Sequence, residues 1–75
     1  MVFEALREMI VEIQGCDEGE VTMRAELRDD LGLSDGQIRE VMEAMSSELG
    51  FRYDESELEE LCTVAELVKY IAGLL

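Results

Sequence analysis

The stretch Asp30-Leu31-Gly32-Leu33-Ser34-Asp35-Gly36 decides how this chain of 75 residues is interpreted. It ends an irregular segment and precedes a run of residues with helical periodicity. Ser34-Asp35-Gly36-Gln37 has the form Ser-x-x-Gln, a capping box in which the two outer side chains satisfy the first free N–H groups of a helix. The stretch therefore predicts a loop that ends near Ser34 and a helix that begins at Ser34 or Asp35.

Outward from this stretch, apolar residues recur at spacings of three and four in three segments, which indicates amphipathic helices. The expected helices are Val2 to Gln14, Ser34 or Asp35 to Leu49, and Thr63 onward, with a short helical turn from Glu55 to Leu61. Glycine C-caps and a threonine N-cap mark several of their ends. The inward faces are expected to hold Phe3, Leu6, Met9, Ile10 and Ile13; Ile38, Val41, Met42, Met45 and Leu49; Leu58 and Leu61; and Val64, Leu67, Val68, Ile71 and Leu74 or Leu75.

The segment between the first two helices lacks sustained periodicity and contains three glycines. Its apolar residues, expected to tuck under the bundle and so keep the loop ordered, are Val21, Met23, Ala25, Leu27 and Leu31. No segment alternates with period two, so no sheet is expected. Residues 1–75 are therefore predicted to form a single all-α domain, a bundle of three main helices plus one short helix, with a long ordered loop after the first helix.

The chain is strongly acidic, with 19 Asp and Glu against 6 Lys and Arg and a net charge of −13. Such a charge repels nucleic acid and anionic lipid and attracts basic protein surfaces. The sequence shows no apolar run of membrane-spanning length and no basic leader. We therefore expect a soluble, cytoplasmic monomer with protein partners. Its two cysteines, Cys16 and Cys62, are expected to be reduced structural thiols.

The residue types needed for independent catalysis are missing from the sequence. It contains no histidine, no glycine-rich phosphate loop followed by lysine, and no metal-ligand spacing. The chain is accordingly expected to be neither an enzyme nor a metalloprotein, and no catalytic or metal-binding residue is assigned.

Several fragments, in their order and spacing, resemble the acyl carrier proteins. Asp30-Leu31-Gly32, followed by serine and aspartate, resembles the family's attachment loop Asp-Leu-Gly-x-Asp-Ser-Leu, and Glu20-Val21-Thr22 lies upstream at the family's spacing. Glu48-Leu49-Gly50 resembles the end of the family's second helix, and Cys62-Thr63-Val64 with Tyr70-Ile71 resembles its last helix. The resemblance covers nearly the whole chain. It implies a small acidic bundle that carries acyl groups on 4′-phosphopantetheine.

Two registers place the attachment serine differently. Without a gap, Asp35 occupies the family's serine position, Ser34 its preceding aspartate and Gly36 its following leucine. With the loop shortened by one residue, Ser34 is the attachment serine and Ile38 replaces a core valine. That valine otherwise falls on Arg39, which is costly to bury without a partner. The gapless register agrees better further along the second helix, so the sequence leaves both registers open.

The resemblance implies that Ser34 carries 4′-phosphopantetheine, where helix N–H groups and the positive end of the helix dipole favour a phosphodiester. The partners would be acyl-transferring or synthase enzymes and a phosphopantetheinyl transferase. Their basic surfaces would contact the acidic residues Asp35, Glu40 and Glu43. In the alternative interpretation, Ser34 is only a helix cap, and the unmodified chain is a degenerate carrier fold that acts as an acidic protein-interaction module.

Overall fold

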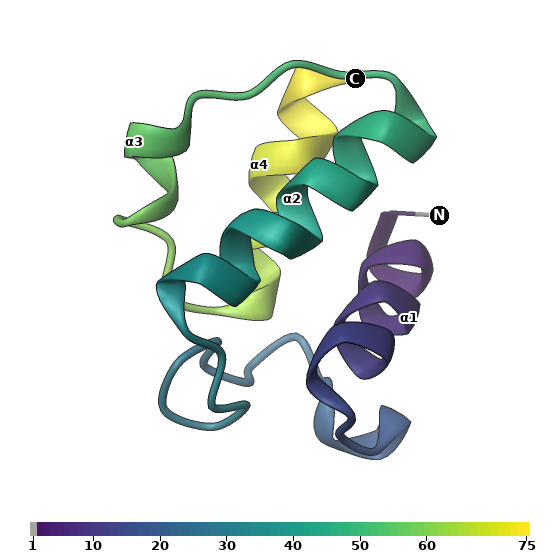
Figure 1. Cartoon of the computed structure of the whole chain (residues 1–75), viewed down its shortest axis with the longest axis vertical. Coiled ribbons are helices and arrows are strands. Elements are labelled where there is room, and N and C mark those ends of the chain that lie inside the picture. Colours follow the sequence, from purple (N-terminus) through teal and green to yellow (C-terminus); the bar gives the residue numbers. More distant parts are fainter. Residues whose placement is uncertain (1) are drawn as a thin grey trace.

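A computed structural model describes residues 2–75 of the chain as an all-α bundle, which confirms the predicted fold class (Figure 1). The elements are α1 (Val2–Gln14), a 3₁₀ turn η1 (Glu18–Glu20), α2 (Asp35–Leu49), α3 (Glu55–Leu58) and α4 (Val64–Leu74). Within the described residues, β pairing is limited to one isolated bridge between Glu26 and Thr63. The helices α1, α2 and α4 thus begin within one residue of their predicted starts.

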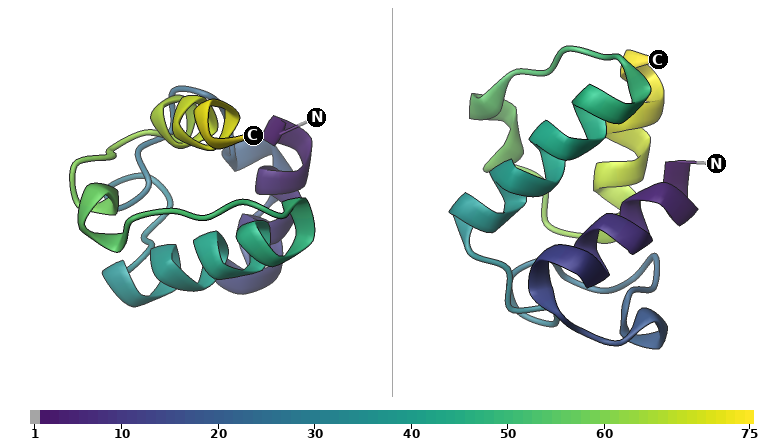
Figure 2. Two further views of the ribbon diagram at one scale, coloured as in Figure 1. Left: turned by 90° about the horizontal axis from the view of Figure 1, so that it is seen from above. Right: turned by 45° about the vertical axis from the view of Figure 1, so that its right-hand side comes forward.

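The helices surround one core. Helix α1 packs against both α2 and α4, and α3 packs against α2. Viewed from above, α2 and α4 lie on opposite sides of the bundle, with α1 toward one end and α3 toward the other (Figure 2). The loop between α1 and α2 lies below the helices in Figure 1. No helix in residues 2–75 is long and apolar enough to cross a membrane.

The core consists of the predicted helix stripes together with apolar loop residues. Side chains that are at most 2% exposed include Leu6, Ile10, Val21, Leu27, Ile38, Val41, Met42, Met45, Val64, Leu67 and Ile71.

Two expectations about buried residues are wrong. Met23 is 42% exposed, because its turn presents the backbone carbonyl, not the side chain, to α4. Leu74 and Leu75, 38% and 62% exposed, lie past Ile71, the last core residue of α4.

The loop after α1 is ordered by hydrogen bonds to the start of α4. The first N–H groups of a helix have no partner within the helix itself. Here the N–H of Val64 donates to the carbonyl of Ala25, and the N–H of Ala65 donates to that of Met23, both at 2.9 Å. In the reverse direction, the N–H of Leu27 donates to the carbonyl of Cys62 at 2.8 Å. These bonds hold the loop against the C-terminal helix.

Helix α3 is shorter than predicted, ending at Leu58 and not at Leu61. Residues 59 and 60 form a turn, and the N–H of Leu61 donates to the carbonyl of Leu58. Acidic side chains are unfavourable at the negative C-terminal end of a helix, and Glu59 and Glu60 would occupy that end of a longer α3. Clustered carboxylates therefore oppose its extension.

Both cysteines are free thiols, as expected. Cys16 is half-buried and Cys62 is exposed. Burial is the largest of the effects that raise the pKa of the Cys16 thiol, with smaller contributions from the charges of Glu20 and Asp17. Cys16 is therefore protonated and unreactive at neutral pH, in keeping with a structural thiol.

Candidate functional site

Ser34 is the N-cap of α2, and the predicted capping box is present. Its backbone is extended, with φ −79° and ψ 166°. The Gln37 N–H donates to Ser34 Oγ at 3.1 Å, and the Ser34 N–H donates to Gln37 Oε1 at 2.9 Å. The residue is exposed to solvent. Its hydroxyl therefore lies in a fixed and accessible position at the start of the helix.

A pair of glutamines fixes this helix start against α1. Gln37 Nε2 donates to Gln14 Oε1 at 2.7 Å, and Gln14 Nε2 donates to the carbonyls of Leu31 and Gly32 at 2.8 and 3.2 Å. These hydrogen bonds hold the loop before Ser34 against the end of α1. This role of Gln14 was not predictable from the sequence, because a glutamine at the end of an amphipathic helix is most often solvated.

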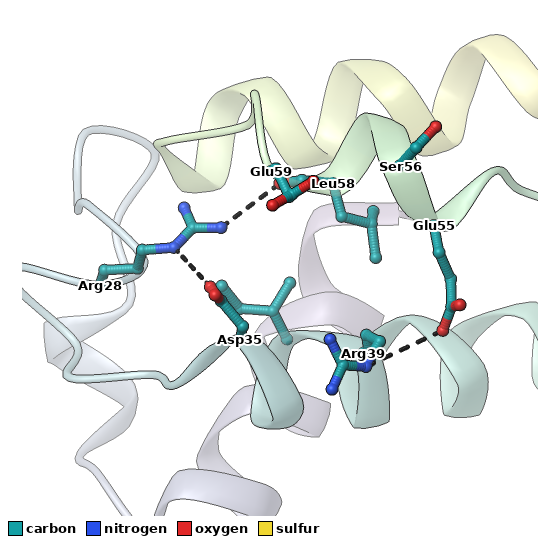
Figure 3. A pocket seen from close by; sticks show the side chains of 8 residues that line it. Arg28, Asp35, Arg39, Glu55, Ser56, Leu58 and Glu59 are labelled. Atoms are coloured by element: carbon teal, nitrogen blue, oxygen red, sulfur yellow. Dashed lines mark hydrogen bonds and ion pairs between the residues drawn. The ribbon is translucent and has the colours of Figure 1, made fainter.

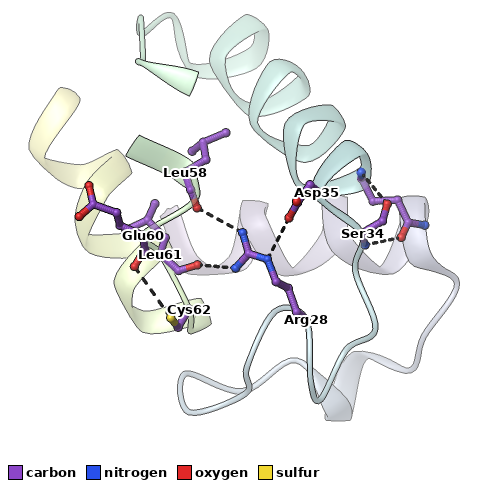
Figure 4. A network of polar contacts seen from close by, with 8 residues as sticks. Arg28, Ser34, Asp35, Leu58, Glu60, Leu61 and Cys62 are labelled. Carbon is purple, nitrogen blue, oxygen red and sulfur yellow. Dashed lines mark hydrogen bonds and ion pairs between the residues drawn. The ribbon is translucent and has the colours of Figure 1, made fainter. Parts of the chain in front are cut away.

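Asp35 is held on the other side of the helix start by Arg28, a half-buried residue of the loop (Figure 4). Arg28 Nε donates to Asp35 Oδ1 at 3.0 Å. The same guanidinium reaches the segment after α3: Nη1 donates to the Leu61 carbonyl at 2.9 Å, and Nη2 to the Leu58 carbonyl at 3.4 Å. Arg28 thus connects the loop, the first turn of α2 and the end of α3.

A cleft of about 290 Å³ opens beside Asp35, between α2 and α3 (Figure 3). Ile38 and Leu58, both buried, contribute apolar walls, and charged side chains surround them. Arg39 Nε lies 3.9 Å from Glu55 Oε1 and joins the two helices across the cleft.

Glu40 and Glu43 lie on a different side of α2 from Asp35. They line a shallow groove between α1 and α2 together with Glu12, and the half-buried side chains of Met9, Ile13 and Ala44 complete it. The three residues that the sequence suggested for partner binding are therefore divided between two surfaces.

Comparison with known proteins identifies the family of this chain. The profile of one protein family, described as "Phosphopantetheine attachment site", matches residues 4–71. The acyl carrier protein of Thermotoga maritima is 36% identical over 70 residues, which cover 93% of this chain and 86% of that protein. The chain belongs to the acyl carrier protein family. Its acyl-carrier function and its 4′-phosphopantetheine prosthetic group, both predicted above, are confirmed by these matches, and so is its role as a carrier and not a catalyst.

The residues at the start of α2 suit this prosthetic group. The hydroxyl of Ser34 is exposed, and the N–H groups of Asp35 and Gly36 belong to the first turn, where the helix offers them no internal partner. Such N–H groups and the positive helix end favour a phosphodiester. Arg28 partly neutralises the adjacent Asp35 carboxylate, which would otherwise repel that anion. Among residues 2–75, no group of three or more His, Cys, Asp or Glu side chains is arranged to hold a metal ion.

Proposed function

We propose that Ser34 is the residue that bears 4′-phosphopantetheine in this acyl carrier, and that the acyl groups are presented as thioesters on the thiol of that arm. The observation that carries the proposal is the position of the Ser34 hydroxyl, which is exposed at the N-cap of α2 beside two first-turn N–H groups. Bound there, the prosthetic group supplies the reactive thiol, and the protein supplies orientation and a docking surface.

The burial pattern of α2 supports the register that keeps Ser34 as the attachment residue. Ile38, four residues after Ser34, is 2% exposed and lies in the core, where that register expects a core valine. Arg39, which the gapless register would place there, has a side chain that is 54% exposed. Asp35 lacks a hydroxyl for a phosphodiester link, and its carboxylate is engaged by Arg28.

We further propose that partner enzymes dock on the groove between α1 and α2. Glu12, Glu40 and Glu43 contribute three carboxylates to it, and Met9 and Ile13 add apolar surface. A basic patch on a synthase, an acyltransferase or a phosphopantetheinyl transferase has the complementary charge. The net charge of −13 favours basic partners and makes copies of the chain repel one another, which supports a monomer. We place the protein in the cytoplasm together with these enzymes.

Intact-mass measurement tests the attachment site. The apo protein is incubated with coenzyme A and a promiscuous phosphopantetheinyl transferase. Wild type and Ser47→Ala, a control on the exposed side of α2, should each gain one phosphopantetheine, and Ser34→Ala should gain none. Ser34→Ala should also lose about 0.5–2 kcal/mol of stability with its cap.

Two outcomes would contradict this assignment. Gain of one phosphopantetheine by Ser34→Ala, at the rate of wild type, would show that another residue carries the arm. Failure of wild type to react with several transferases would favour the unmodified interaction module, in which Ser34 is only a cap.

Charge reversal tests the docking groove. The double variant Glu40→Lys, Glu43→Lys should bind a basic partner enzyme at least about tenfold more weakly and with a smaller salt dependence, because charges at the rim of an interface act mainly on encounter. The matched control is Glu20→Lys, Glu60→Lys, whose exposed carboxylates do not line the groove. Equal binding by the two double variants, measured by titration calorimetry at two ionic strengths, would remove this groove as the docking site.

A further inference from the structure

Arg39 and Arg28 both line the cleft between α2 and α3, but they differ in how firmly they are held. Arg28 makes three hydrogen bonds, whereas Arg39 has one ion pair, with Glu55, at 3.9 Å. The side chains of that pair are 54% and 65% exposed. An ion pair so long and so exposed contributes little to stability. Arg39 is therefore the cation in this cleft that can change partner.

The guanidinium of Arg39 and the hydroxyl of Ser34 both lie near Gly36. Side chains on a helix lean toward its N-terminus, and Arg39 reaches back one turn to Gly36. A Cβ atom placed on Gly36 would lie 3.9 Å from both Arg39 Nη2 and Ser34 Oγ. Gly36 has no side chain that could separate the guanidinium of Arg39 from the hydroxyl of Ser34. The first turn of α2 thus combines a hydroxyl, two free N–H groups and a cation.

We propose that Arg39 binds the phosphodiester of the prosthetic group once Ser34 carries it, and that Arg39 thereby gives up its ion pair with Glu55 on α3. This inference rests on the proposed attachment at Ser34. Nε and Nη2 form the edge of the guanidinium that binds phosphate oxygens bidentately, and Nε is the atom nearest Glu55. A charge-assisted bidentate contact at a helix N-terminus outweighs an exposed pair at the limit of contact distance.

The exchange of partners would loosen one end of α3. Glu55 begins this helix, while Arg28 still holds the carbonyls of Leu58 and Leu61 at its other end. Attachment of the arm would therefore remove one contact at the N-terminal end of α3, where the Tyr70 hydroxyl still accepts from the Asp54 N–H and donates to Glu57, and would open the cleft beside Ile38 and Leu58 on that side.

The test compares apo and modified protein for wild type, Arg39→Gln, Glu55→Gln and the control Arg52→Gln. Intact mass first establishes that each protein is modified. The ³¹P chemical shift of the phosphodiester should then differ from wild type in Arg39→Gln and not in Arg52→Gln. Amide hydrogen exchange at Glu57 and Ser56 should become several-fold faster on modification in wild type, and should be fast in both forms of Arg39→Gln and Glu55→Gln.

The outcomes separate this inference from the function on which it rests. If wild type gains no mass, attachment at Ser34 fails and the inference fails with it. If wild type is modified but the ³¹P shift is the same in Arg39→Gln and Arg52→Gln, Arg39 does not bind the phosphodiester. If modification changes the rate of amide hydrogen exchange in α3 by the same factor in wild type and in Arg39→Gln, modification does not release Glu55. Either of the last two results overturns the inference and leaves the carrier function intact.

Discussion

Removal of the Arg28 guanidinium should destabilise the protein by about 2 kcal/mol. The variant Arg28→Met keeps most of the aliphatic stem and removes only the polar head. The 2.9 Å bond to the Leu61 carbonyl is a charge-assisted contact, worth about 1.5 kcal/mol at the low end of its range because the side chain is 34% exposed. The 3.4 Å bond to Leu58 adds little. The pair with Asp35, whose side chain is 65% exposed, adds about 0.5 kcal/mol.

Urea denaturation followed by circular dichroism measures this loss. For a domain of this size, about 2 kcal/mol corresponds to a fall in Tm of about 10 °C. Arg28→Lys should fall between wild type and Arg28→Met, because a single ammonium keeps the charge beside Asp35 but lacks the planar fork that reaches two carbonyls. Arg52→Met, at an exposed position, serves as the control. A loss for Arg28→Met no larger than that of the control would show that Arg28 does not stabilise the junction between α3 and the start of α2.

Two further variants test the loop and the cap of α4. Gly32→Ala should lower the free energy of unfolding, measured by urea denaturation, by about 1–2 kcal/mol. The reason is that Gly32 has a φ of +68° and the new Cβ would lie 3.2 Å from Gln14 Nε2. The control Gly19→Ala has open space at its Cβ position and should be nearly neutral. The N–H groups of Cys62 and then Thr63 hold the pKa of the Glu66 carboxyl below its ordinary value. Its ionised form therefore stabilises the fold above the ordinary glutamate pKa, and this contribution is lost as the pH falls through the lowered pKa. Wild type should exceed Glu66→Gln in stability at neutral pH by a margin that shrinks in acid; a margin independent of pH would contradict this.

The main helices were predictable because their information is local. The spacing of apolar residues located α1, α2 and α4. The capping boxes at Ser34 and Thr63 form between residues three apart, so both partners can be recognised in one short stretch of sequence. The length of α3 was not predictable from spacing alone, since Leu58 and Leu61 share a face in a helix and in the tighter turn that the chain adopts.

The contacts around the candidate site were harder to predict because they join distant segments. Arg28 reaches carbonyls about thirty positions away, and Gln14 reaches Gln37 from the preceding helix. Carbonyl groups belong to every residue, so no pattern of side chains marks where an arginine will bind them. The sequence correctly placed Ser34 and Asp35 at the start of a helix. It grouped Asp35 with Glu40 and Glu43 as partner-binding residues, and the helix places those two on another surface.

The hydrogen bonds between the loop and α4 also bear on when the chain becomes ready for modification during synthesis. A ribosome releases Ser34 well before Val64 and Ala65, yet the carbonyls of Ala25 and Met23 receive their hydrogen bonds from those two residues. The segment leading to α2 is therefore completed only after the C-terminal helix has emerged. We expect a nascent chain that stops before Val64 to accept no phosphopantetheine from a transferase that modifies the full chain. Synthesis of α4 would then determine when Ser34, which is made earlier, can be loaded.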